Sequence, residues 1–163
     1  MGKFYGTILV LVAFLTVLST ACGAGGKSFS AKLDGVQEVP PVVTEAKGEA
    51  TVKFNSAMTQ AEFEVKVSNI MDVTMAHIHL AAAGKNGTPV VWLYPSASPA
   101  KLILGKSDGK LATGTFTAAN LVGPLAGKSL NDLFSEITAG NAYVNVHTSK
   151  NPSGEIRGQL SKG

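Results

Sequence analysis

The chain has 163 residues and a formal net charge of +3, and charged residues make up only 15% of it. Its lysines are scattered singly, so it lacks the concentrated basic patch that displaces counterions from phosphates, and nucleic acid is not an expected partner. The single cysteine, Cys22, excludes an intramolecular disulfide, a thiolate zinc cluster and a Cys-His nucleophile. The length is that of one compact domain.

Residues 1–21 have the pattern of an export signal. Lys3 gives a positive start, an almost unbroken apolar run extends from Thr7 to Leu18, and small residues follow it. The apolar run is shorter than the roughly 20 residues of a comfortable membrane span. We therefore predict a signal peptide over residues 1–21 and a mature chain that begins near Cys22.

Cys22 follows the small-residue cleavage site directly, where a bacterial lipoprotein carries its acylated cysteine. Residues 18–22 resemble a lipobox, although Ser19 stands where an aliphatic residue is preferred. Lipidation of Cys22 is the favoured interpretation, and ordinary cleavage to a secreted protein stays open. Either way we expect an extracytoplasmic protein whose only membrane contact is the lipid, with residues 22–28 as a flexible linker.

Residues 29–160 consist of short alternating runs broken by Gly, Pro, Asn and Asp, which is typical of an antiparallel all-β domain. In residues 61–67 apolar and charged side chains alternate strictly, so one face of this strand should be buried. Residues 50–54 repeat the pattern and predict a hairpin with it. We expect one antiparallel β-sandwich of the Ig-like, Greek-key type.

Further strands are expected at residues 75–80, 90–94, 102–104 and 112–117. A tight turn at residues 84–87 predicts a hairpin between the first two of these strands. Trp92 is expected to fill the core. The last two strands are expected to flank a turn at Asp108-Gly109.

One short helix is expected near residues 129–139. Its apolar residues recur at spacings of three and four, Ser129 and Asp132 form a capping box, and Gly140 provides a stop. The pattern predicts that this helix closes one end of the sandwich. The final unit, residues 142–160, is expected to be a hairpin with residues 151–154 at its tip.

All three histidines lie in two of the predicted strands. Because side chains alternate along a strand, His77 and His79 leave one face of their strand. Tyr143, Asn145 and His147 likewise share one face of residues 142–148. If the two strands are neighbours in the sheet, three imidazoles converge on one patch.

This patch is a candidate metal site. Neutral imidazole nitrogens of His77, His79 and His147 are suitable ligands for copper or zinc, with the fourth ligand missing or supplied by water. Met75 shares the face and offers a thioether that favours Cu(I), while Asn145 or Glu155 is a candidate to orient a ring. In the alternative interpretation, the histidines hydrogen-bond to polar neighbours and only hold two hairpins together.

Four segments carry a family resemblance: residues 76–79 (AHIH), 87–91 (GTPVV), 143–148 (YVNVHT) and 151–160 (NPSGEIRGQL). Together they resemble the chordin-type domain, called CHRD, over about residues 29–160. Leu80 departs from the glycine that the family commonly places after the second histidine. The resemblance implies an extracellular or envelope β-sandwich, found in bacteria as a single-domain exported protein. Membership of the family does not by itself establish an enzymatic activity.

We therefore expect an exported, lipid-anchored binding module that coordinates copper or zinc, with no catalytic residue assigned. One alternative is an adhesive or structural module that contacts an extracellular or envelope macromolecule, with Trp92 and Tyr94 as contact candidates. Another is a mononuclear copper redox protein resembling superoxide dismutase, for which three histidines are few.

Overall fold

The computed structural model describes residues 1–2 and 27–163. Cys22 and nearly all of the predicted signal peptide lie outside the described residues, as does most of the predicted linker. Strand β1 (Lys27–Asp34) begins two residues before the expected domain boundary at Phe29. Within the described residues, no helix has the length and hydropathy that a membrane span requires.

Strands dominate the rest of the chain. In chain order they are β2 (Lys47–Phe54), β3 (Ala61–Leu80), β4 (Thr88–Tyr94), β5 (Ile103–Phe116), β6 (Ala142–Thr148), β7 (Ile156–Gln159) and β8 (Ser161–Lys162), with helix α1 (Leu130–Thr138) before β6 and short 3-10 helices at Gly35–Gln37, Ala118–Asn120 and Gly123–Leu125. Every strand pair is antiparallel. The predicted antiparallel all-β class is therefore confirmed.

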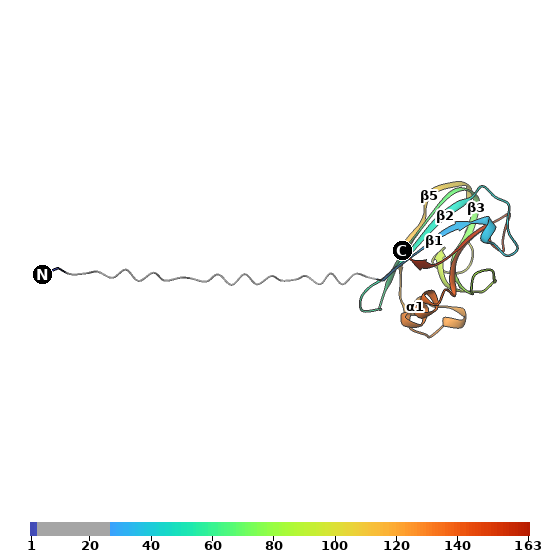
Figure 1. Cartoon of the computed structure of the whole chain (residues 1–163). Helices are drawn as coiled ribbons and strands as arrows, with labels where there is room; N and C mark the ends of the chain where they lie inside the picture. The colour runs from blue at the N-terminus through green and yellow to red at the C-terminus, as the bar shows by residue number, and fades with distance from the viewer. Residues whose placement is uncertain (3–26) are drawn as a thin grey trace.

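The sheet closes on itself instead of forming two facing layers. Strands β1, β2, β3, β6 and β7 make a ring, because β3 pairs with both β2 and β6, and β7 pairs with β1 at Arg157 and Asp34. Strands β4 and β5 extend the sheet from β3, and β8 pairs with β1. Figure 1 shows β1, β2, β3 and β5 side by side in this curved wall. The expected sandwich is thus replaced by a five-stranded barrel with added strands.

Strand β3 explains the closure. It is 20 residues long, and its first part pairs with β2 and β5 while its second part pairs with β4 and β6. Asn69 and Asp72 adopt left-handed conformations at the irregular middle of the strand, where the register shifts. One continuous strand therefore belongs to both halves of the domain and joins them into one sheet.

The expected turn at Asp108-Gly109 is wrong, because β5 runs through it as one strand. The Asp108 carboxylate accepts the backbone N–H of Asn69 at 2.7 Å, and the Asp72 carboxylate accepts the backbone N–H of Gly105 at 2.7 Å. Gly109 has a φ of 94° at a register irregularity. Residues that are typical of a turn here form bulges that join β3 to β5.

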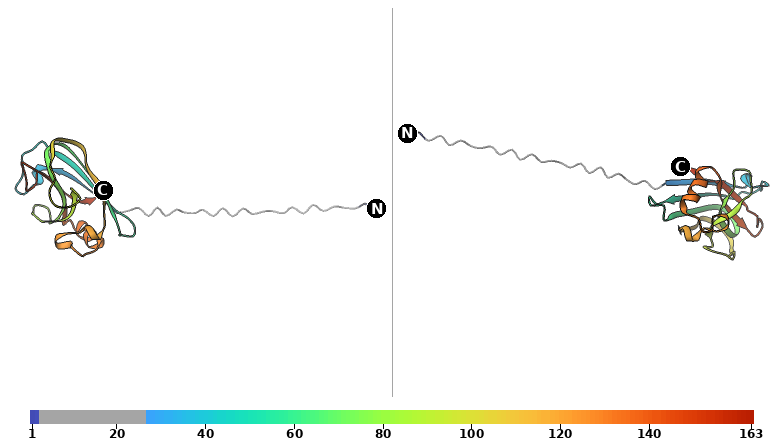
Figure 2. Two further views of the ribbon diagram at one scale, coloured as in Figure 1. Left: turned by 180° about the vertical axis from the view of Figure 1, so that it is seen from behind. Right: turned by 90° about the horizontal axis from the view of Figure 1, so that it is seen from below.

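The predicted hairpins and the predicted helix are present. The β2–β3, β3–β4 and β6–β7 hairpins form, and α1 begins after Ser129 with the expected Asp132 capping box. The Phe134 ring of α1 packs edge-on against Phe29 and Phe54, at centroid distances of 5.5 and 5.6 Å. The helix thus covers the barrel end where β1 begins and β2 ends, as Figures 1 and 2 show.

The barrel interior takes one face of β3 and of β6, as their alternation predicts. Ala76 and Ile78 of β3 and Val144 and Val146 of β6 are fully buried in the core. Trp92 differs from its expectation: Val91 and Leu93 enter the core, and Trp92 is half-buried on the opposite face of β4. The same face of the sheet carries the histidines.

Candidate metal centre

Strands β3 and β6 are neighbours, which is the arrangement that the histidine hypothesis requires. Their register pairs Met75 with His147, His77 with Asn145 and His79 with Tyr143. Directly paired residues of antiparallel strands project from the same face of the sheet. The structure therefore places all of these side chains on one side, outside the barrel interior.

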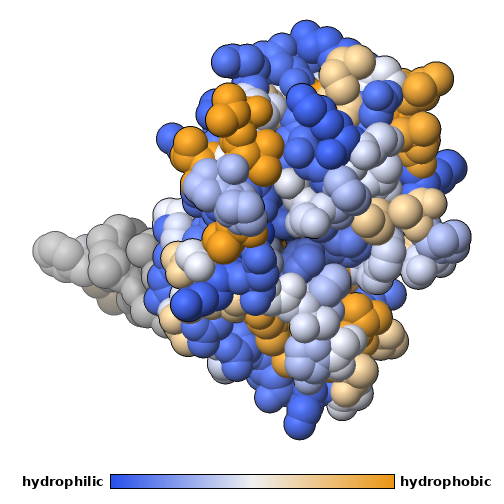
Figure 3. Space-filling model, turned by 90° about the vertical axis from the view of Figure 1, so that its right-hand side faces the viewer, coloured by the Kyte–Doolittle hydropathy of each residue, from blue (hydrophilic) through white to orange (hydrophobic). Residues whose placement is uncertain are grey.

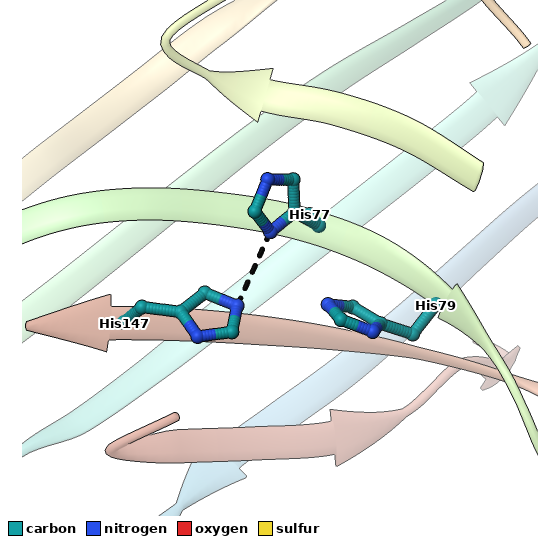
Figure 4. A group of neighbouring side chains, drawn as sticks. All are labelled: His77, His79 and His147. Atoms are coloured by element: carbon teal, nitrogen blue, oxygen red, sulfur yellow. Dashed lines mark hydrogen bonds between the residues drawn. The ribbon is translucent and has the colours of Figure 1, made fainter. Parts of the chain in front are cut away.

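The three imidazole rings meet above this pair of strands (Figure 4). The ring centroids are 5.1 Å apart for His77 and His147, 5.4 Å for His77 and His79, and 5.6 Å for His79 and His147. One nitrogen of each ring lies within 4.8 Å of one nitrogen of each other ring. The geometry is compatible with a single ion held by three imidazoles.

These rings are buried although they lie outside the barrel. Exposed fractions are 3% for His77, 6% for His79 and 5% for His147. Trp92 packs edge-on against His77 with 4.2 Å between ring centroids, and Tyr143 stacks on His79 at 5.0 Å. Aromatic side chains thus form part of a second, polar layer over the outer face of β3 and β6.

Burial keeps the histidines uncharged. It lowers the pKa of His77 to about 3 and the pKa of His147 to about 4, and the neighbouring histidine rings lower both further. Burial also lowers the pKa of His79, against the opposing effect of its hydrogen bond to Gly87. A neutral imidazole is the form that binds metal ions. The rings are therefore in their ligand form at neutral pH.

Backbone carbonyls determine which ring nitrogens carry protons. Nδ1 of His79 lies 2.9 Å from the Gly87 carbonyl oxygen, and Nδ1 of His147 lies 3.0 Å from that of Pro152. Because a carbonyl oxygen only accepts, both Nδ1 atoms donate, and each Nε2 atom carries a lone pair that can accept a hydrogen bond or bind an ion. His147 Nε2 then accepts from Nδ1 of His77 at 3.1 Å.

Two buried ring nitrogens, His77 Nε2 and His79 Nε2, have no hydrogen-bond partner among the described residues. In Figure 4 the outer nitrogen of His79 points toward His147, whereas the second nitrogen of His77 points away from both rings. An ion at the junction therefore meets one unused lone pair, on His79 Nε2. The lone pairs of His147 Nε2 and His77 Nδ1 face the ion once the proton between these two atoms has moved to His77 Nε2.

The accessory residues have different places. Met75 is half-buried opposite His147, and Asn145 is buried opposite His77 with its Oδ1 unpartnered among the described residues. The Glu155 carboxylate contacts no histidine; it accepts hydrogen bonds from Thr44, Thr148 and Asn151. The ring-orienting role that the sequence suggested for Glu155 belongs to two backbone carbonyls, which side-chain patterns do not reveal.

A buried ion pair lies beside the site. Arg157 of β7 donates from Nε and Nη2 to the same Glu38 oxygen, at 2.7 and 2.6 Å. Both side chains are buried, and burial raises the pKa of the Glu38 carboxyl while Arg157 opposes the rise. Sequence reasoning missed Glu38, because it lies 119 positions from Arg157 in a segment without regular pattern.

The same arginine anchors the loop that orients His79. Its Nη1 donates to the Lys85 carbonyl at 3.1 Å, its Nη2 donates to the Asn86 side chain at 2.6 Å, and its guanidinium lies 4.6 Å from the Tyr143 ring centroid. The Tyr143 hydroxyl in turn accepts the backbone N–H of Gly87 at 3.0 Å. The Gly87 carbonyl is therefore held by residues from β6 and β7.

The depressed histidine pKa values predict a pH-dependent stability in the metal-free protein. Below pH 6.5 the unfolded chain takes up protons at His77 and His147 that the folded chain does not accept until about pH 3 and 4. The free energy of unfolding should thus fall on acidification, by up to about 1.4 kcal/mol per pH unit for each histidine. Urea unfolding with a chelator present, from about pH 7 to about pH 5, measures this slope.

The matched control for this slope is the double variant His77→Gln/His147→Gln. It removes both depressed pKa values, so its stability should change less over the same pH range. Equal slopes for the two proteins would contradict the burial of neutral imidazoles.

The Arg157–Glu38 pair predicts strong coupling between two distant positions. Arg157→Met leaves a buried, unpaired carboxylate and should lower the free energy of unfolding by about 3–5 kcal/mol. The double variant Glu38→Gln/Arg157→Met removes both charges and should recover more than half of that loss. Denaturant titrations of the four proteins measure the coupling, and a double variant no more stable than Arg157→Met would contradict it.

Searches among curated proteins and among solved structures found no significant match to this chain. A comparison with protein-family models matched residues 29–160 to the CHRD domain. The matched segment contains all three histidines, the Glu38–Arg157 pair and the barrel from β1 to β7. The matched range is the same as the range expected from the four segments that resemble the CHRD domain. The chain belongs to the CHRD domain family.

Proposed function

We propose that this protein is an exported, lipid-anchored binding module that holds one copper or zinc ion through His77, His79 and His147. The observation that carries the proposal is the convergence of three buried, neutral imidazoles with a lone pair left unused. Copper and zinc are among the metals that imidazole ligands suit.

The energetics of burial support the proposal. A buried polar atom without a partner destabilises the folded protein by about 1–3 kcal/mol. His77 Nε2 and His79 Nε2 are two such atoms within one small cluster. A bound ion would give His79 Nε2 its missing partner and would replace the proton between His77 and His147. The cluster is therefore better explained as a ligand set than as an internal support.

The hydrogen bonds around the rings also match those of metal ligands. A metal-binding histidine usually donates its second ring N–H to a carbonyl or carboxylate, which fixes the ring and its tautomer. His79 and His147 do so to Gly87 and Pro152. The alternative role, in which the rings bond to polar side chains and join two hairpins, is not favoured by these partners.

The N-terminal sequence supports the proposed location. Residues 1–21 have the pattern of a signal peptide, and Cys22 stands at the position of a lipoprotein's acylated residue. The proposed site uses no thiolate ligand, so it needs no cysteine from the domain. Attachment through Cys22 would leave residues 29–160 in the extracytoplasmic compartment.

Metal titration tests the proposed site. The full chain carrying Cys22→Ser, which removes the only thiol, should bind about one equivalent of copper or zinc at micromolar concentration. His77→Gln, His79→Gln and His147→Gln should each weaken binding by at least about tenfold to a hundredfold, since loss of an outer hydrogen bond alone has that effect. Glu62→Gln, which changes an exposed carboxylate on β3, is the control and should bind normally.

Absence of histidine-dependent binding would overturn the proposed site and leave the adhesive alternative. The large hydrophobic side chains that the described surface exposes are Val36, Val43, Met71, Leu102 and Leu104, apart from the N-terminal methionine. In Figure 3, hydrophobic residues on the face shown form separate groups divided by hydrophilic ones. That face therefore offers no continuous apolar surface for a macromolecule.

The proposed anchor has its own test. Expressed in a bacterium with a lipoprotein pathway, the chain should sediment with membranes and incorporate labelled fatty acid. Cys22→Ser should abolish the label and release the domain from the membrane fraction, whereas Ser19→Ala should preserve both properties. Labelling of the Cys22→Ser variant, or its full retention on membranes, would contradict attachment through this residue.

A further inference from the structure

We infer that the three-histidine site is selective for monovalent copper over divalent zinc or divalent copper. The inference rests on the proposed function and specifies the ion for the same site. Four properties carry it: a donor set without negative charge, the burial of that set, the small number of lone pairs that its hydrogen bonds leave free, and the thioether of Met75 on the same face.

The donor set carries no negative charge. Among the described residues, the group of potential ligands that surrounds the site contains the three histidines and no carboxylate. Two buried carboxylates lie outside this group. Glu155 accepts from threonine and asparagine side chains, and Glu38 is paired with Arg157 through Oε2, while its Oε1 has no hydrogen-bond partner among the described residues. An ion bound here would therefore keep its full charge.

Burial raises the desolvation free energy of an ion bound at this site. The rings are only 3–6% exposed, and Trp92 and Tyr143 pack against two of them. The desolvation penalty of an ion grows with the square of its charge, so the penalty for a dication is about four times that for a monocation of the same size. The positive guanidinium of Arg157, stacked on Tyr143, further disfavours a second charge. A monovalent ion suits this environment better.

The hydrogen bonds leave one lone pair free at the junction, on His79 Nε2, and His147 Nε2 offers a second when an ion displaces the His77 N–H that it accepts. Copper(I) accepts two or three soft or borderline donors, whereas zinc takes four ligands in nearly all its sites. Zinc would need the His77 proton to move and also a fourth ligand at a nearly enclosed position. Copper(I) needs only these two nitrogens, both of which are available once the His77–His147 hydrogen bond opens.

Met75 offers the additional donor that copper(I) prefers. It is half-buried, and the β3–β6 register places it directly opposite His147 on the histidine face. A thioether sulfur is a soft, uncharged ligand that favours Cu(I) over harder divalent ions. The chain also supplies a matched comparison, because Met71 on the same strand is 50% exposed and pairs with Lys106 of β5.

Three titrations of the full chain with Cys22→Ser test the inference. Cu(I) is presented with ascorbate and a coloured competing chelator, and Cu(II) and Zn(II) are each presented with a chelator of known affinity. We expect Cu(I) to bind about a hundredfold or more tightly than Zn(II), and more tightly than Cu(II). His77→Gln, His79→Gln and His147→Gln should each weaken Cu(I) binding.

The methionine variants examine the soft donor. Met75→Leu should reduce Cu(I) affinity by about tenfold and leave the weaker Zn(II) affinity unchanged, whereas Met71→Leu should change neither. Circular dichroism of each variant verifies that it is folded. Equal effects of the two methionine substitutions would overturn the role of Met75.

The outcomes separate this inference from the proposed function. Histidine-dependent binding in which Zn(II) or Cu(II) equals or exceeds Cu(I) would overturn the selectivity and leave the metal site intact. Absence of histidine-dependent binding for all three ions would overturn both. Preference for Cu(I) that persists when the histidines are replaced would place the copper elsewhere and overturn the selectivity of this site.

Discussion

The register between β3 and β6 is the constraint on which the rest of the structure depends. It pairs His77 with Asn145 and, one step along, buries Ile78 with Val144 in the barrel. A slip of one residue would exchange the two faces, turning imidazoles into the core and valines into the polar layer. The fully buried aliphatic side chains therefore hold the histidines in place, although they never touch an ion.

Closure of the barrel extends the same constraint to distant loops. Because β7 returns beside β6 and pairs with β1 at Asp34, Arg157 comes within hydrogen-bond distance of Glu38 just beyond the end of β1. The arginine then reaches the loop before β4 through Asn86. Three chain segments that are far apart in sequence are thus joined over one face. This is how an outer barrel surface becomes a buried polar layer.

Much of this architecture follows from local pattern. Alternation identified the strands that carry His77 and His147, and capping residues located α1, because each signal lies within a few neighbouring residues. Barrel closure was not predictable in this way, since it depends on β3 pairing with four different strands. The same limit applies to Asp108, whose carboxylate meets a backbone N–H 39 positions away.

The site shows the same division between local and long-range information. Convergence of the three rings could be anticipated from side-chain alternation, given one assumption about which strands are neighbours. The tautomers of the rings could not be anticipated, because they depend on the carbonyl oxygens of Gly87 and Pro152. Every residue has a backbone carbonyl, so the sequence does not show which one a ring will meet. Glu155 makes no hydrogen bond to a ring for a related reason: hydroxyl and amide donors already occupy its oxygens.

Two glycines in the loops over the site lie where the structure has no space for a Cβ atom. A Cβ atom on Gly87 would overlap the Leu80 carbonyl oxygen, so any side chain there would move the carbonyl that His79 uses. A Cβ atom on Gly154, whose φ is 132°, would overlap the side chains of Asn145 and Glu38. Backbone therefore approaches the polar layer more closely than a substituted residue permits. Ring orientation, loop packing and the buried ion pair are thus parts of one structure, and a change to any of them reaches the nitrogens that would hold an ion.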